Sequence, residues 1–143
     1  MAARTSDEGT LPAASSGFVL DTSAVIALVS DEPGADEVQA ILEGTEPVAL
    51  PFIVLMEMRY ILLRRVSASD IDQLFILLTS GSTYVPESDP LWGRRAAEIK
   101  AGGGLSMADS WIAALALRRD AILVHNDKEF NRVARLRSRR VPQ

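Results

Sequence analysis

The sequence contains no cysteine and only one histidine, His125. Without cysteine the chain has no disulfide framework, no thiolate zinc site and no cysteine nucleophile, and such a composition fits a reducing compartment. Any bound metal must therefore be held by oxygen ligands or by His125.

Long apolar runs are also missing. Charged residues interrupt every stretch before the ~18 to 20 residues that a membrane-spanning helix needs. The first 17 residues, MAARTSDEGTLPAASSG, lack the apolar core of a secretory signal. We therefore expect a cytoplasmic protein without a membrane partner, in which residues 1–17 form a flexible tail.

The chain does have the composition of one globular domain. It has 143 residues, of which 48% are hydrophobic and 24% charged. The net charge of −4 at pH 7 argues against a surface that coats nucleic acid, although residues 131–143 contain five arginines. We expect a domain over 18–136, followed by a basic tail over 137–143 that is either a solvated end or a phosphate contact.

Short apolar runs alternate with longer helical patterns along the chain. Strands are predicted at 18–20, 47–50, 83–85 and 121–124, and helices at 24–32, 34–42, 51–65, 67–80, 90–101 and 107–119. Strands separated by helices pair in parallel through right-handed crossovers. The predicted fold class is α/β, a three-layer α/β/α arrangement with a central, mostly parallel sheet.

Asp21 and Asp127 each follow a predicted strand, so both should lie at the carboxyl edge of the sheet, where ligands bind in such folds. Asp109 lies in the first turn of the helix 107–119. Glu57 is the only acid within an apolar helix that belongs either to the core or to a subunit interface.

Each acid also has a local explanation. Asp21 can cap a helix, Asp109 can form a capping pair with Ser106, and Asp127 can begin a turn. Glu57 can pair with Arg59 or a neighbouring arginine at a subunit interface. Four converging carboxylates would repel one another, however, and Mg²⁺ or Mn²⁺ would relieve that repulsion.

Four segments, FVLDTSAVIAL, LMEMRYILL, LSMADSWIAALAL and ILVHNDKEF, resemble the acidic motifs of PIN-domain ribonucleases, particularly VapC-type toxins of toxin–antitoxin pairs. The resemblance covers about residues 18–136. It implies a PIN-like fold in which the catalytic metal ligands are Asp21, Glu57, Asp109 and Asp127. Ser23 and Asn126 would assist. His125 departs from the pattern, since many members carry Thr or Ser at that place.

The implied activity is a Mg²⁺- or Mn²⁺-dependent ribonuclease in which metal-activated water cleaves RNA, leaving a 5′-phosphate and a 3′-hydroxyl. The implied partners are an RNA substrate, a cognate antitoxin and a second copy in a homodimer. RNA phosphates would contact basic residues, for which the candidates are Arg64, Arg65, Arg118 and Arg119.

Two other functions stay open. A phosphatase or phosphotransferase could use Asp21 as its nucleophile, although such sites usually carry a second aspartate where this chain has Ser23. A catalytically silent PIN-like module could bind a partner. His125 is either a general base, a metal ligand or a structural hydrogen-bonding group.

Overall fold

The computed structural model describes residues 16–143. These residues form one sheet of five parallel strands in the order β3-β2-β1-β4-β5. The strands are β1 (Phe18–Leu20), β2 (Val48–Pro51), β3 (Thr83–Val85), β4 (Ile122–His125) and β5 (Ser138–Arg140). Except for its last two residues, the predicted N-terminal tail lies outside the described part of the chain.

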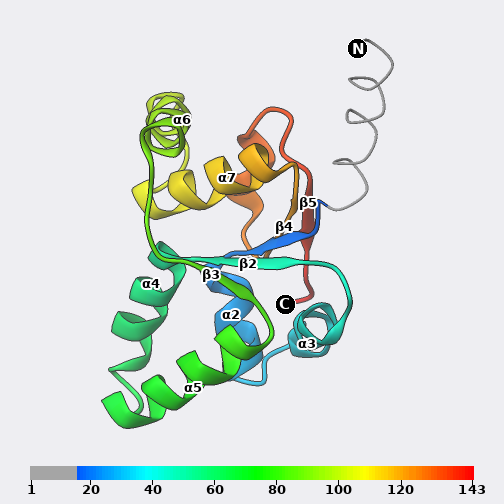
Figure 1. Ribbon diagram of the computed structural model, residues 1–143, viewed down its shortest axis with the longest axis vertical. Helices are drawn as coiled ribbons and strands as arrows, with labels where there is room; N and C mark the ends of the chain where they lie inside the picture. Colours follow the sequence, from blue (N-terminus) through cyan, green and yellow to red (C-terminus); the bar gives the residue numbers. More distant parts are fainter. Residues whose placement is uncertain (1–15) are drawn as a thin grey trace, which may run out of the picture.

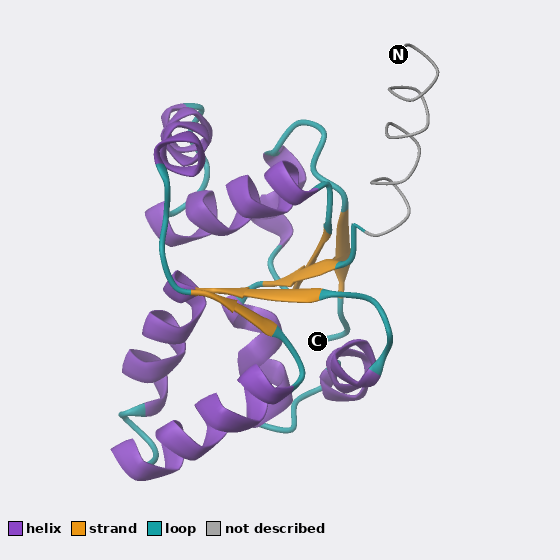
Figure 2. Ribbon diagram, in the orientation of Figure 1, coloured by secondary structure: helices purple, strands orange, loops and turns teal. Residues whose placement is uncertain are grey.

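Helices cover both faces of this sheet (Figure 1). They are α2 (Thr22–Val29), α3 (Ala35–Glu43), α4 (Phe52–Leu62), α5 (Ala68–Ser80), α6 (Pro90–Ala101) and α7 (Met107–Arg119), with a short 3₁₀ helix, η1 (Lys128–Arg132). Helices α6 and α7 lie on one face and α2 to α5 on the other (Figure 2). The predicted three-layer α/β/α fold is confirmed, and every strand pair is parallel.

Side-chain caps explain where most helices begin. The Ser67 hydroxyl accepts the N–H of Asp70 at 3.1 Å at the start of α5, and a carboxylate oxygen of Asp89 accepts the N–H of Trp92 at 3.0 Å in α6. Such caps satisfy backbone donors that lack a partner within the helix. Helix α7 has the bounds that its cap and apolar pattern predict.

The sheet order brings the ends of β1 and β4 together. Strand β1 is central, with Val19 and Leu20 fully buried, and the N–H of Asp21 donates to the carbonyl of Val124 at 2.9 Å. Helix α7 leads into the start of β4, so the N-terminus of α7 lies at the carboxyl edge of the sheet. The acids after β1 and β4 and the acid in the first turn of α7 therefore share one edge.

The C-terminal segment differs from the prediction. Residues that we assigned to a basic tail form β5, which pairs with β4 through residues such as Arg139 opposite Val124. Val141 beyond it is 2% exposed. The strand was not predicted because three of the four residues in 137–140 are charged. An edge strand in contact with solvent need not show an apolar pattern. Helix η1 was not predicted either.

Helix α4 is both part of the core and exposed. Its inner face buries Val54, Met58 and Leu62. Its outer face carries an apolar stripe of Met56, Tyr60 and Leu63, each about half exposed. Between residues 16 and 143, no helix combines the length and apolar character needed to cross a membrane.

Candidate metal centre

Asp21 is the most buried acid of the site. It is 3% exposed and caps α2, with its Oδ2 atom accepting both the N–H of Ser23 at 3.0 Å and the Ser23 hydroxyl at 2.5 Å. Its Oδ1 atom is buried and has no hydrogen-bond partner among residues 16–143. A buried carboxylate oxygen needs a compensating donor or cation. The local capping role and a ligand role thus use different oxygens.

Asp109 lies in the first turn of α7. Its N–H donates to the Ser106 hydroxyl at 3.1 Å, which is the Ser106 half of the predicted capping pair. The positive end of the helix dipole stabilises a negative charge at this position. This capping bond uses the backbone of Asp109, while a side-chain hydrogen bond with Ser106 acts to lower the pKa of the Asp109 carboxyl group.

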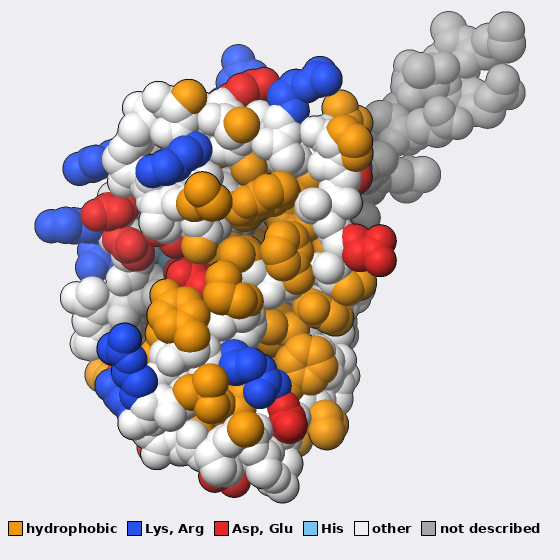
Figure 3. Space-filling view, turned by 90° about the vertical axis from the view of Figure 1, so that its left-hand side faces the viewer, with side chains coloured by type: hydrophobic (Ala, Val, Ile, Leu, Met, Phe, Trp, Pro, Cys, Tyr) orange, Lys and Arg blue, Asp and Glu red, His pale blue; other side chains and the backbone are white. Residues whose placement is uncertain are grey.

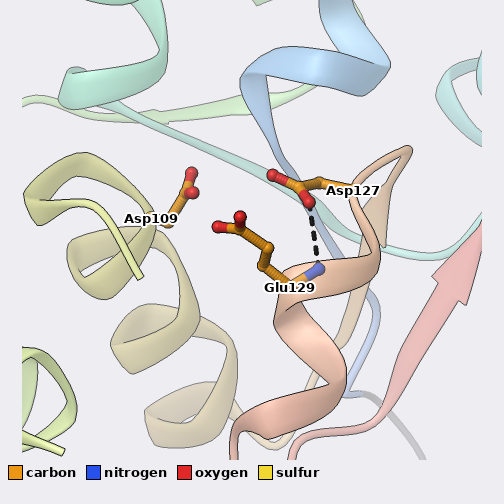
Figure 4. Close-up of side chains that lie close together, drawn as sticks. All are labelled: Asp109, Asp127 and Glu129. Atoms are coloured by element: carbon orange, nitrogen blue, oxygen red, sulfur yellow. Dashed lines mark hydrogen bonds between the residues drawn. The ribbon is translucent and has the colours of Figure 1, made fainter. Parts of the chain in front are cut away.

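Asp127 and Glu129 bring two further carboxylates to Asp109. One oxygen of Asp127 caps η1 by accepting the N–H of Glu129 at 2.9 Å. Each of the three acids offers an oxygen, and these oxygens all lie within 4.8 Å of one another. Figure 4 shows the side chains converging from α7, from the loop before η1 and from η1 itself. Three carboxylates at this spacing form a donor set that suits a hard divalent cation.

Glu129 was not among the predicted site residues. It is an acid two residues after Asp127, but it reaches the other carboxylates only because the chain turns tightly in the 3₁₀ helix η1. That turn folds the Glu129 side chain back toward α7 (Figure 4).

Burial and mutual repulsion raise the pKa of two of these acids. The pKa of Asp21 rises to about 7, mainly because burial penalises its charge, with smaller contributions from Asp109 and Glu57, while Ser23 hydrogen bonds oppose the rise. The pKa of Asp109 rises to about 6, again mainly through burial, and the charges of Glu57, Asp127 and Glu129 add to it. The charge of Glu57 thus contributes to both shifts.

Glu57 is held from α2 rather than by an arginine. Its Oε1 atom accepts the Thr22 hydroxyl at 2.5 Å, and Thr22 is itself buried. Arg59 pairs instead with Asp72 on α5. Within the chain, Glu57 therefore pairs with Thr22 and not with Arg59. Glu57 lies outside the group of three oxygens formed by Asp109, Asp127 and Glu129.

Ser23 and Asn126 connect the ends of β1 and β4. The Ser23 hydroxyl donates to Asp21 and accepts the N–H of Asn126 at 2.8 Å. The Asn126 side-chain oxygen is buried and has no partner within the described residues. Ser23 thus fixes the position of Asp21 relative to the loop that carries Asp127.

His125 is the last residue of β4 and is 1% exposed. Its Nδ1 atom accepts the N–H of Asp127 at 3.0 Å, so His125 acts as a hydrogen-bonding group beside the carboxylates. Burial lowers its pKa, which favours the neutral ring.

The predicted phosphate-contacting arginines are spread over the molecule. Arg118 pairs with Asp89, and Arg119 lines a recess with Phe18 and Thr83, which begin strands. Both therefore lie at the amino edge of the sheet, because α7 runs opposite to the strands, and they do not border the acids. Arg64 and Arg65 are exposed after the end of α4.

The protein is thus a three-layer α/β/α domain with a parallel sheet and a group of carboxylates at the carboxyl edge of that sheet. A family model for the PIN domain matches residues 18–136, and the chain belongs to this family. No curated protein matches the chain significantly in sequence.

Several solved structures have a similar fold. A chain of DNA-bound VapBC from Salmonella typhimurium is 21% identical with a TM-score of 0.71, covering 87% of this chain and 97% of its own. A chain of promoter-DNA-bound VapBC2 from Rickettsia felis is 21% identical with a TM-score of 0.69, covering 87% and 98%. VapBC-5 from Mycobacterium tuberculosis, of the VapBC family of toxin–antitoxin systems, is 24% identical with a TM-score of 0.56, covering 88% and 99%. These likenesses show the fold.

Proposed function

We propose that the protein is a metal-dependent ribonuclease that acts as the toxin of a toxin–antitoxin pair. The observation that carries the proposal is the convergence of Asp109, Asp127 and Glu129 within 4.8 Å, beside a buried Asp21 oxygen without a partner in residues 16–143. A PIN-domain chain with an intact acidic site is expected to be a nuclease rather than a silent binding module.

The donor set fits Mg²⁺ or Mn²⁺. Asp109, Asp127 and Glu129 would hold the ion, with Asp21 contributing its free Oδ1 atom and Glu57 acting directly or through water. A divalent ion at such a site lowers the pKa of bound water and neutralises charge on a phosphodiester. Ionised Asp21 and Asp109 are favoured once that positive charge is present, because it opposes the burial and repulsion that raise their pKa.

The protein's own side chains would orient this site. Thr22 holds Glu57, Ser23 holds Asp21, and the Ser106 cap fixes the first turn of α7 that carries Asp109. The preorganised carboxylates would then keep an RNA phosphodiester and the attacking water in one orientation.

RNA is the proposed substrate class. Figure 3 shows acidic side chains bordered by Lys and Arg side chains on one side of the molecule. Such basic residues would contact the flanking phosphates, whereas the acids would repel RNA in the absence of metal. Arg64 and Arg65 stay candidates for these contacts, and binding should weaken as salt rises.

An antitoxin and a second copy are the proposed protein partners. Met56, Tyr60 and Leu63 form an apolar stripe along and just after α4, and each is about half exposed. Figure 3 shows hydrophobic side chains gathered on the side of the molecule that it presents. Exposed apolar surface of this kind is typical of protein interfaces. The fold likeness to chains of VapBC complexes supports both the toxin role and an antitoxin partner.

The test is an RNA cleavage assay with the tag-free chain, structured RNAs and Mg²⁺ or Mn²⁺. Cleavage should require metal, stop with EDTA and leave 5′-phosphate ends. Asp109→Asn should reduce the rate by at least about 100-fold, because loss of a ligand exceeds the 10- to 100-fold effect of outer-shell changes. Asp36→Asn, on the exposed surface of α3, is the matched control and should cleave like the parent.

Two outcomes would overturn the proposal. Equal cleavage by parent, Asp109→Asn and EDTA-treated samples would show that cleavage needs neither the metal nor Asp109, which contradicts a metal-dependent ribonuclease. Metal-dependent release of phosphate from a small phosphoester, without RNA cleavage, would instead favour the phosphatase.

A further inference from the structure

We propose that His125 is a positioning residue whose Nδ1 atom, by accepting the N–H of Asp127, sets the direction in which the Asp127 carboxylate faces Asp109 and Glu129. The inference rests on the proposed function, because it takes Asp127 as a metal ligand. It assigns His125 no proton transfer and no metal contact.

Side chains, rather than backbone carbonyls, hold the loop after β4. The N–H of Asn126 donates to the Ser23 hydroxyl at 2.8 Å, that of Asp127 to His125 at 3.0 Å, and that of Glu129 to Asp127 at 2.9 Å. Side-chain acceptors two residues before an N–H form tight local turns. His125 plays this part for the residue that brings its carboxylate to the cluster.

Both the backbone and the ring of His125 are held in place. The backbone carbonyl accepts the N–H of Val141 at 2.8 Å, which ties the residue to the segment after β5. Its ring meets the buried Phe130 ring edge-on, with centroids 5.0 Å apart and an interplanar angle of 61°. Phe130 belongs to η1, so the ring links the end of β4 to the helix that follows Asp127. Because the backbone and the ring of His125 are both held, the direction in which its Nδ1 atom accepts a hydrogen bond is fixed.

The cost of burying this imidazole supports a specific role for it. With Nδ1 as acceptor, a neutral ring carries its proton on Nε2. Nε2 is buried and has no partner among residues 16–143. A buried donor without a partner is destabilising, and an apolar ring would avoid that penalty. The Nδ1 hydrogen bond is what an apolar ring could not provide.

The two carboxylate oxygens of Asp127 can then have different roles, one in capping η1 and the other in binding the metal ion. One oxygen caps η1 through Glu129, and the backbone N–H is held by His125. With both the backbone and one oxygen fixed, the second oxygen is directed into the cluster (Figure 4). Without the acceptor at 125 the carboxylate would sample more orientations, and the affinity for metal would fall.

The first test is the tautomer of His125 in the metal-free protein. His125 is the only histidine of the sequence, so the imidazole ¹⁵N signals of a tag-free sample belong to it without assignment. We expect the neutral Nε2–H tautomer. The Nδ1–H tautomer would overturn the proposal, because Nδ1 could not then accept the N–H of Asp127.

The second test separates the acceptor from the ring. His125→Phe keeps a ring against Phe130 but removes the acceptor, whereas His125→Asn removes the ring but keeps an acceptor within reach of residue 127. We expect His125→Phe to speed hydrogen exchange of the Asp127 amide by roughly tenfold in metal-free protein, as loss of one hydrogen bond implies. It should weaken Mn²⁺ binding by about 10- to 100-fold. His125→Asn should stay within about threefold of the parent in Mn²⁺ affinity, since the acceptor is retained.

The opposite ranking, with His125→Phe binding Mn²⁺ like the parent and His125→Asn losing affinity, would show that ring packing matters and would overturn the proposal. His125→Leu supplies a second acceptor-free variant if His125→Phe does not fold. A parent that binds no Mn²⁺ would contradict the proposed function. Amide exchange in the metal-free variants would then decide alone whether His125 holds Asp127.

Discussion

At the residue scale, the two acids with raised pKa values couple protonation to folding. The pKa values of about 7 for Asp21 and about 6 for Asp109 exceed the ordinary 3.8. Between about pH 4 and pH 7 these two carboxyl groups therefore bind more protons in the folded protein than in the unfolded chain. Their contribution to the free energy of unfolding of metal-free protein should fall as pH rises through this window and be lost above pH 7, whereas His125, whose pKa is lowered by burial, contributes in the opposite sense.

Asp21→Asn should remove much of this pH dependence. At pH 8, without metal, the variant should be more stable than the parent by about 2 kcal/mol, which discounts the full value of the shift for relaxation of the site. At pH 4 the two proteins should differ little, because Asp21 is then protonated. Thermal unfolding across this pH range measures both. A parent that gains stability relative to the variant on going from pH 4 to pH 8 would contradict the account.

Binding of a divalent metal ion should offset the loss of stability that the metal-free protein shows at high pH. At pH 8, Mn²⁺ at about 100 times its dissociation constant should stabilise the parent by about 2.7 kcal/mol. At pH 5 the gain should be much smaller, because protonated carboxyl groups do not bind the ion. Asp109→Asn should lose most of the gain at pH 8. An equal gain in Asp109→Asn and in the exposed control Asp36→Asn would mean that Mn²⁺ binds elsewhere.

At the element scale, the ends of helices and strands determine which side chains meet. Asp21 and Asp109 are placed by the starts of α2 and α7, and Asp127 by the cap of η1. Strand β5 supports this arrangement from outside, because it covers the edge of β4. The N–H of Leu123 donates to the carbonyl of Arg137 at 2.9 Å.

Removal of residues 137–143 should therefore destabilise the domain. The deletion exposes the edge of β4 and removes the buried Val141, and we expect a loss of about 3 kcal/mol from apolar burial and hydrogen bonds together. Removal of Gln143 alone is the control and should change little, since this residue is exposed. Urea unfolding measures both. Equal stability of the two truncated chains would show that β5 is only a tail.

At the scale of the whole molecule, the apolar stripe of α4 is exposed. A homodimer would bury the stripe of Met56, Tyr60 and Leu63, provided that the interface reaches the roughly 1,200 Å² typical of specific contacts. Tyr60→Lys should then convert a dimer into a monomer in sedimentation equilibrium without lowering stability, because half of that side chain is exposed. Asp36→Asn, which changes the net charge by the same +1, is the control. A parent that sediments as a monomer would contradict the homodimer.

Much of the architecture was predictable because local signals agreed with it. The Ser106 cap and the apolar pattern that follows it predicted α7, and the run Thr83–Val85 before Pro86 predicted β3. The sheet order was not predictable, because it depends on how crossovers pack, and it decides whether Asp109 meets Asp127. Glu129 was missed for a related reason, since only the turn of η1 brings it back to the cluster. Local patterns thus predicted the elements, whereas tertiary packing determined the membership of the site.

We expect carboxylates at the carboxyl edge of the sheet to hold a divalent ion. Anomalous diffraction from crystals of the protein grown with Mn²⁺ at pH 8 would locate that ion. A peak should lie within coordination distance of oxygens from Asp109, Asp127 and Glu129. Absence of a peak at those oxygens, in crystals whose Mn²⁺ concentration exceeds the dissociation constant measured in solution, would mean that these carboxylates do not form the metal site.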